Sequence, residues 1–269
     1  MRRPLPLAFT LGVLASALAL SSCSAGTPNP AGSSSDAAVQ TTATATDSPS
    51  AVAGAATIAA PSVCDAVDLK ADAAVAGADL AACVVGFSKA AGSGHETFSA
   101  SDGTTGTADF VFGDAPALSG TVTSSGGTTS FVLTPDASWV TIDGAWVQGD
   151  ATSSDPKKML AGTIGQAYRA FADPSATASL ISSAPTWTVQ KDQDVVDLPD
   201  GTQARAWRVQ ADAPFSAVGA DVQEMTLWLT SGHVPAGVQA TVSVAGTQTT
   251  TTQHFSGWGM PVSIATPQP

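Results

Sequence analysis

Three cysteines are the side chains with the clearest chemistry in this chain of 269 residues. Cys23, Cys64 and Cys83 could carry a lipid, form a disulfide, bind a metal or take part in redox chemistry. The three histidines lie far apart in the sequence: His95, His233 and His254. The sequence contains no G-x-S-x-G, H-E-x-x-H or phosphate-binding glycine motif. We therefore expect no enzyme activity, no catalytic residues, no cofactor and no metal site.

The N-terminus predicts export. Arg2 and Arg3 precede an uncharged run of apolar and small residues at 5–20, which is the arrangement of an export signal. The run ends in LSSC at 20–23, which resembles the bacterial lipobox, where the chain is cleaved before a cysteine that receives diacylglycerol. We expect a lipoprotein signal peptide at 1–22 and a lipid (diacylglyceryl and palmitate) on Cys23. An ordinary secretory signal that happens to contain a cysteine is the alternative.

Residues 23–60 predict a flexible tether. They are almost entirely Ser, Thr, Ala, Gly and Pro, with charges only at Asp36 and Asp47, and they show no apolar period. A flexible chain of this length has a mean reach of about 30–35 Å. Because two acyl chains anchor a protein durably, we expect the tether to hold one folded domain, 61–269, at the outer face of the cell membrane.

The charge balance argues against nucleic-acid binding. The chain has 10 basic and 22 acidic residues, a net charge of −12, whereas nucleic-acid binding needs a basic face. Cleavage before Cys23 removes Arg2 and Arg3 and leaves a net charge near −14. Such a surface repels anionic headgroups, so the membrane partner is expected to be reached only through the lipidated cysteine.

The other two cysteines predict a structural disulfide. Residues 79–91 have helical spacing, with Leu80, Cys83, Val84 and Phe87 on one apolar face and Gly92 at the position of a C-cap. A bridge from Cys64 to this face would be worth roughly 3 kcal/mol, and exported proteins form disulfides readily. A redox pair or a metal site remains open, although the sequence contains no Cys-x-x-Cys spacing.

A run of four aspartates resembles a calcium-binding site at first. It consists of Asp192, Asp194, Asp197 and Asp200. Because the run lacks the ligand order and the terminal Glu of an EF-hand, a solvated strand edge with a hairpin turn at Asp200-Gly201 is the preferred interpretation.

The remaining pattern predicts short antiparallel strands interrupted by two helices. Asp143-Gly144 between alternating segments is a strong hairpin signal. Asp155-Pro156 begins a helix with a wide apolar stripe, and a shorter helix follows at 176–181. Gly162 and Gly165 weaken the first helix by about 1 kcal/mol each, so it is either held by packing or built to move. Half-apolar strands return from Trp187 onward, which indicates one covered and one wet sheet face.

This order of elements resembles that of the LolA-like half-barrel lipid carriers, most closely the actinobacterial lipoproteins of the LprG/LppX type. The local matches are DPKKML at 155–160, WVTIDGAWV at 139–147 and FSGWGMPV at 255–262, and the resemblance spans about 78–267. The cysteine pair and the long tether depart from the family pattern. The resemblance implies an α+β fold: a strongly curved antiparallel sheet, or half-barrel, capped by helices that enclose acyl chains of a lipid or glycolipid.

The expected concave face has apolar lipid-cavity candidates. They are Phe110, Phe112, Phe131, Leu133, Val140, Ile142, Leu160, Ile164, Tyr168, Phe171, Val209, Met225, Leu227 and Leu229. None is charged, as acyl-chain binding requires, although the same residues could close into a dry core. Trp139, Trp146 and Trp228 have the opposite strand parity and are expected outside or at rims.

The function that follows by resemblance is that of a monomeric lipid carrier or shield without covalent catalysis. The alternative is a cell-surface interaction or sensor module with the same fold but no cavity, favoured if the helix at 157–172 packs flush on the sheet.

Overall fold

The computed structural model describes residues 58–113, 115–172, 174–217, 219–244 and 246–267. The expected signal peptide, the lipidated Cys23 and the tether up to residue 57 lie outside the described residues. So do the side chains of Tyr168 and Phe171, although the backbone of their helix is described.

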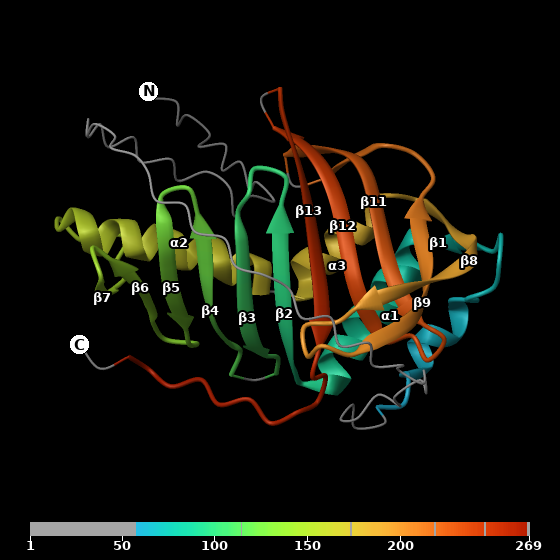
Figure 1. Ribbon diagram of the computed structural model, residues 1–269, viewed down its shortest axis with the longest axis horizontal. Coiled ribbons are helices and arrows are strands. Elements are labelled where there is room, and N and C mark those ends of the chain that lie inside the picture. Colours follow the sequence, from blue (N-terminus) through green and yellow to red (C-terminus); the bar gives the residue numbers. More distant parts are fainter. Residues whose placement is uncertain (1–57, 114, 173, 218, 245, 268–269) are drawn as a thin grey trace, which may run out of the picture.

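One open antiparallel sheet contains all the described strands (Figure 1). Its order is β1 (Ala74–Ala76), β8 (Thr186–Asp197), β9 (Gln203–Ala211), β11 (Ala220–Thr230), β12 (Pro235–Val244), β13 (Thr247–Ser256), β2 (Ser93–Ala100), β3 (Thr105–Val111), β4 (Ala117–Ser124), β5 (Gly127–Leu133), β6 (Ser138–Ile142) and β7 (Ala145–Gln148). The short β10 (Phe215–Ala217) pairs with β11. The chain leaves the sheet after β7 and returns at β8, so the last strand, β13, pairs with β2 in the middle of the sheet.

The helices lie on one side of this sheet, behind it in Figure 1. They are α1 (Gly77–Ala91), α2 (Pro156–Ala172) and α3 (Pro174–Ser182), and a 3-10 turn, η1 (Ser62–Ala66), precedes them. The expected α+β class, an antiparallel sheet covered by helices, is thereby confirmed, and the sheet is consistent with the curved one expected. We call the helix-covered side the inner face and the opposite side the outer face.

Local signals in the sequence determine where these elements end. Gly92 has a φ of 76° directly after α1, the left-handed conformation of a helix C-cap. Asp143 and Gly144 both have positive φ between β6 and β7, as a two-residue hairpin of type I′ requires. The Asp155 carboxylate accepts a hydrogen bond from the backbone N–H of Lys157 at the start of α2. These three predictions are confirmed.

Two apolar clusters lie on the inner face. The disulfide-side cluster joins η1, α1 and α3 to the half of the sheet that runs from β1 to β12, and it includes Cys64, Val75, Leu80, Cys83, Ile181, Trp187, Val189, Val209, Met225, Leu227 and Leu229. The aromatic cluster joins α1 and α2 to the other half and includes Phe87, Phe110, Phe131, Leu133, Val140, Ala161 and Trp258. The two clusters divide the interior at β13 and β2.

Aromatic rings lie across glycines in the aromatic half. A Cβ placed on Gly94 would approach Phe110 Cζ to 2.5 Å, and one placed on Gly120 would approach Phe131 Cζ to 2.8 Å. The rings therefore rest on the bare backbone of the neighbouring strand, which shields it from water and gives these glycines a packing role. Phe110 also contacts Trp258, with ring centroids 5.3 Å apart.

Candidate functional site

The lipid-cavity candidates divide between the two clusters. Phe110, Phe131, Leu133 and Val140 are buried in the aromatic cluster. Val209, Met225, Leu227 and Leu229 are buried in the disulfide-side cluster. The structure thus brings each set together but does not join the two sets into one group.

The candidates at the border of the aromatic cluster keep part of their surface exposed. Phe112, Ile142 and Ile164 are half-buried and pack against it. Leu160, one turn before Ile164 on α2, is half-buried as well. In contrast, Val209 and Leu229 are fully buried. An apolar ligand would meet accessible apolar surface beside α2, and the disulfide-side cluster has a similar half-buried border at Trp207 and Phe215.

Polar side chains lie on the inner face between the two clusters, beside Phe98 and Phe255 of the aromatic cluster. On β13, Thr249 and Thr251 pair with Val242 and Ala240 of the disulfide-side cluster, so their side chains share the inner face. Gln253 continues the same row towards the middle of the strand. Glu96 lies on the adjacent strand β2. We use the name polar strip for these four residues: Glu96, Thr249, Thr251 and Gln253.

Glu96 is placed on the inner face by its register. It is paired with Ala108 on β3 and with Phe255 on β13, both of which belong to or pack against the aromatic cluster. The residue is half-buried, and the surrounding protein raises the pKa of its carboxyl to about 7 through desolvation. Among the described residues, no hydrogen bond or ion pair is formed by this carboxyl. Near neutral pH it therefore exchanges a proton inside an apolar setting.

Glu96 is the site residue that the sequence analysis missed. The expected cavity residues are all uncharged, and a glutamate in a largely polar segment does not fit that pattern. The signal was available in the alternation of the strand, because Gly94, Glu96 and Phe98 share one face. What the sequence could not show is the pairing of Gly94 with Phe110, which turns that face toward the helices.

The acidic run is tied into the hairpin of β8 and β9. Trp228 Nε1 donates a hydrogen bond to an oxygen of Asp194 at 2.9 Å, and Arg208 lies 3.6 Å from the same oxygen. Asp197 accepts a bond from Gln203, and Asp200 caps the turn by accepting one from the backbone N–H of Thr202. Within the described residues, no group of three or more His, Cys, Asp or Glu side chains is placed to hold a metal ion.

The tryptophans with opposite parity do not line the inner face. Trp228 lies between Leu227 and Leu229 on β11 and points to the outer face, where it contacts the His254 ring edge-on at 6.4 Å. Desolvation there lowers the pKa of His254. Trp139 and Trp146, on β6 and β7, are half-buried.

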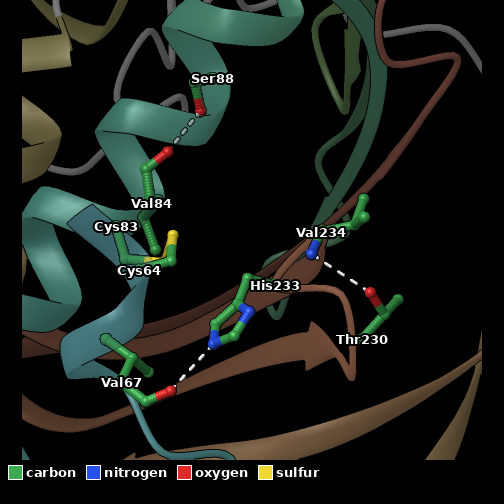
Figure 2. The surroundings of a disulfide bond; sticks show 8 residues. All are labelled: Cys64, Val67, Cys83, Val84, Ser88, Thr230, His233 and Val234. Atoms are coloured by element: carbon green, nitrogen blue, oxygen red, sulfur yellow. Dashed lines mark hydrogen bonds between the residues drawn. A yellow bond between two sulfur atoms is a disulfide. The ribbon is translucent and has the colours of Figure 1, made fainter. Parts of the chain in front are cut away.

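The cysteine pair fixes the start of the described chain onto α1. The sulfur atoms of Cys64 and Cys83 are 1.99 Å apart, which agrees with the predicted disulfide. Figure 2 shows this bond between η1 and α1, with His233 reaching from the turn between β11 and β12. His233 Nε2 donates to the backbone carbonyl of Val67 at 2.9 Å. Residues 64–67 are therefore held from two sides, as a structural role requires.

Helix α2 packs through glycines against β6 and against the loop that follows β7. A Cβ on Gly165 would lie 2.4 Å from the Cβ of Ser138 on β6, and one on Gly162 would lie 2.3 Å from the backbone nitrogen of Ala151. These contacts are possible only without side chains at both positions. Of the two explanations for the weak helix formers, the structure supports close packing.

No described helix is long and apolar enough to cross a bilayer. The chain matches no protein-family model, and no curated protein is significantly similar to it.

Proposed function

We propose that the protein is an exported lipoprotein that binds the acyl chains of an envelope lipid or glycolipid between the helices and the sheet of a LolA-like half-barrel. The lipid on Cys23 would hold it to the outer face of the cell membrane, and the tether at 23–60 would give the folded part its reach. No covalent chemistry is involved: the ligand enters, is shielded from water and is released to an acceptor.

The observation that carries this proposal is the half-buried apolar surface beside α2. Ile142 of β6 and Leu160 and Ile164 of α2 keep part of their surface exposed. Apolar surface that is sheltered but not fully buried suits a removable apolar ligand.

The test is native mass spectrometry of the protein purified without detergent. We expect a co-purifying lipid mass that is absent after organic extraction. If the protein carries no such mass and also takes up no added alkyl ligand, the lipid-binding proposal is wrong.

Membrane anchoring is tested separately with Cys23→Ala. Fractionation of cells should find wild-type protein with membranes and the variant released, because the variant lacks the lipidated thiol. Ser34→Ala, within the tether, provides the control, since it leaves both the proposed lipid and the disulfide in place. Retention of the Cys23→Ala variant in the membrane fraction would contradict the anchoring account.

A second candidate function is an interaction or sensor module with the same fold. The contact of α2 with Ser138 favours it, because at Gly165 the helix lies too close to β6 to admit even a Cβ. In that case α2 would not lift, and alkyl ligands would not bind. The mass-spectrometric experiment therefore distinguishes the two functions.

A further inference from the structure

The polar strip runs through the middle of an otherwise apolar interior. On one side, Thr249 and Thr251 adjoin Val242 and Ala240 of the disulfide-side cluster. On the other side, Glu96 adjoins Ala108 of the aromatic cluster. Figure 1 shows the two strands that form the strip, β13 and β2, next to each other at the centre of the sheet. Any ligand that extends along the inner face from one half to the other would cross these side chains.

Hydrogen bonds within the protein do not account for the strip. None of its four side chains has a hydrogen-bond partner among the described residues, whereas the outer-face threonines on the same strand do: Thr250 bonds to Thr241, and Thr252 to Gln239. Polar groups placed against apolar surroundings without partners are costly. The strip therefore lowers stability unless another molecule supplies the partners.

The polar atoms of the strip remain reachable. Arg208 Nε is the one side-chain nitrogen or oxygen of the described part of the chain that is both sealed from solvent and without a partner. The unpartnered oxygens and nitrogen of the strip are consequently not completely sealed from solvent. They offer one carboxyl, two hydroxyls and one amide.

We propose that the Glu96 end of the polar strip, with Gln253 diagonally opposite, binds a hydroxyl or amine group of an amphiphile, and that Glu96 is the principal hydrogen-bond acceptor. The inference rests on the proposed lipid-binding function and specifies its ligand class. A ligand hydroxyl donates a hydrogen bond to the Glu96 carboxyl whether that carboxyl is charged or protonated. A ligand ammonium group forms an ion pair with the charged carboxyl. A ligand carboxylate or phosphate would instead place a second acid beside Glu96, which like-charge repulsion disfavours.

Other titratable groups near the strip face away from it. His95 and Asp109 form a pair 2.7 Å apart on the outer face, next to Glu96 and Ala108 in sequence. His254 also lies on the outer face, on β13. Helix α3 contains no titratable side chain, and those of α1, Asp79 and Lys89, are exposed. With a pKa near 7, Glu96 is the group whose ionisation changes the preference of the strip around neutral pH.

The experiment compares three probes that share one alkyl chain: tetradecylamine, tetradecan-1-ol and tetradecanoic acid. Binding is measured by native mass spectrometry and fluorescence competition on the full chain carrying Cys23→Ala. At about pH 8.5, where Glu96 is charged, we expect the amine to bind at least about 10-fold more tightly than the acid. At about pH 5.5 the difference should shrink, because Glu96 is then largely protonated.

Two substitutions of Glu96 isolate its role. Glu96→Gln keeps the shape and removes the charge, so the amine preference should fall to about 2-fold or less while the alcohol still binds. Glu96→Leu removes the acceptor altogether, so the tighter binding of the alcohol than of the acid should be lost as well. Glu224, the other glutamate of the chain, is exposed on β11, and Glu224→Gln is the matched control that should leave the ranking unchanged.

The outcomes separate the inference from the proposed function. If the probes bind the wild type, Glu96→Gln and Glu96→Leu with one and the same ranking, the strip is not the site and lipid binding stands. If no probe binds the wild type, both proposals are wrong.

Discussion

The two halves of the sheet are held to their helices in different ways. In the disulfide-side half, Trp187, Val209 and Leu229 are fully buried, and a covalent bond fastens η1 to the helix that covers them. In the aromatic half, rings lie across glycines, and α2 meets β6 at Gly165 without a covalent link. Both clusters have half-buried apolar side chains at their borders, so the disulfide is what distinguishes the two halves. The following predictions test that contrast.

We expect the largest effect on stability from removing a large buried side chain in the disulfide-side half. Trp187 is fully buried, and its Nε1 donates to the backbone carbonyls of Ile181 and Ala184, which ties α3 to β8. Trp187→Ala should lower the free energy of unfolding by about 3–5 kcal/mol in urea denaturation. Phe112→Ala, at a half-buried position of the other half, is the comparison and should cost less than about 2 kcal/mol. Equal losses would remove the distinction between the halves.

Loss of the disulfide should have the second-largest effect on stability. Cys64 and Cys83 are 19 residues apart, and a cross-link of this span is worth about 3 kcal/mol in the chain-entropy model. Cys64→Ser with Cys83→Ser should therefore lower stability by about that amount. Hydrogen exchange should show faster opening of η1 and α1, while α2 and β5 to β7 keep their protection. Loss of protection spread evenly over both halves would show that they unfold as one unit.

Ionisation of Glu96 should make the boundary between the halves sensitive to pH. Its pKa is about 7 in the folded protein and near 4.5 in an unfolded chain, so the folded state binds the proton more tightly. Stability is therefore lost as pH rises from about 4.5 to about 7 and levels off above that range. A pKa difference of this size corresponds to a loss of about 3 kcal/mol in the free energy of unfolding. Because the carboxyl is partly exposed, solvent screening reduces the expected loss to roughly 2 kcal/mol.

The check is urea denaturation of wild type and Glu96→Gln at several pH values. The variant should be more stable than the wild type at about pH 8 and close to it at about pH 4.5. Glu224→Gln, on the exposed side of β11, should follow the wild-type profile. A wild-type profile that runs parallel to that of Glu96→Gln would show that Glu96 titrates as an ordinary surface carboxyl.

Features encoded by neighbouring residues could be predicted from the sequence. The C-cap at Gly92, the hairpin turn at Asp143-Gly144 and the N-cap at Asp155 depend on a few adjacent positions, and all three were found in the structure. The pairing of Cys64 with Cys83 was predicted for a similar reason, since one lies on the buried face of a helix and the other shortly before it.

Features that depend on which strands become neighbours could not be predicted. The return of β13 to the side of β2 joins residues more than 150 positions apart, and it is this pairing that puts Gln253 opposite Phe98, diagonally across from Glu96. Likewise, the division of the apolar candidates into two clusters follows from the strand order, which an alternating pattern does not contain.

The smallest predicted effect concerns the packing of α2 against the aromatic half. In an isolated helix, Gly165→Ala would be stabilising by about 1 kcal/mol. Here the added Cβ meets the Cβ and Oγ of the buried Ser138 at 2.4 Å, so overpacking should outweigh that gain and leave a net loss of about 1 kcal/mol. Adding Ser138→Gly removes both clashing atoms, and the double variant should recover most of the loss relative to Ser138→Gly alone. If Gly165→Ala is instead stabilising, α2 stands further from β6 in solution, and its readiness to lift would argue for ligand entry beneath it.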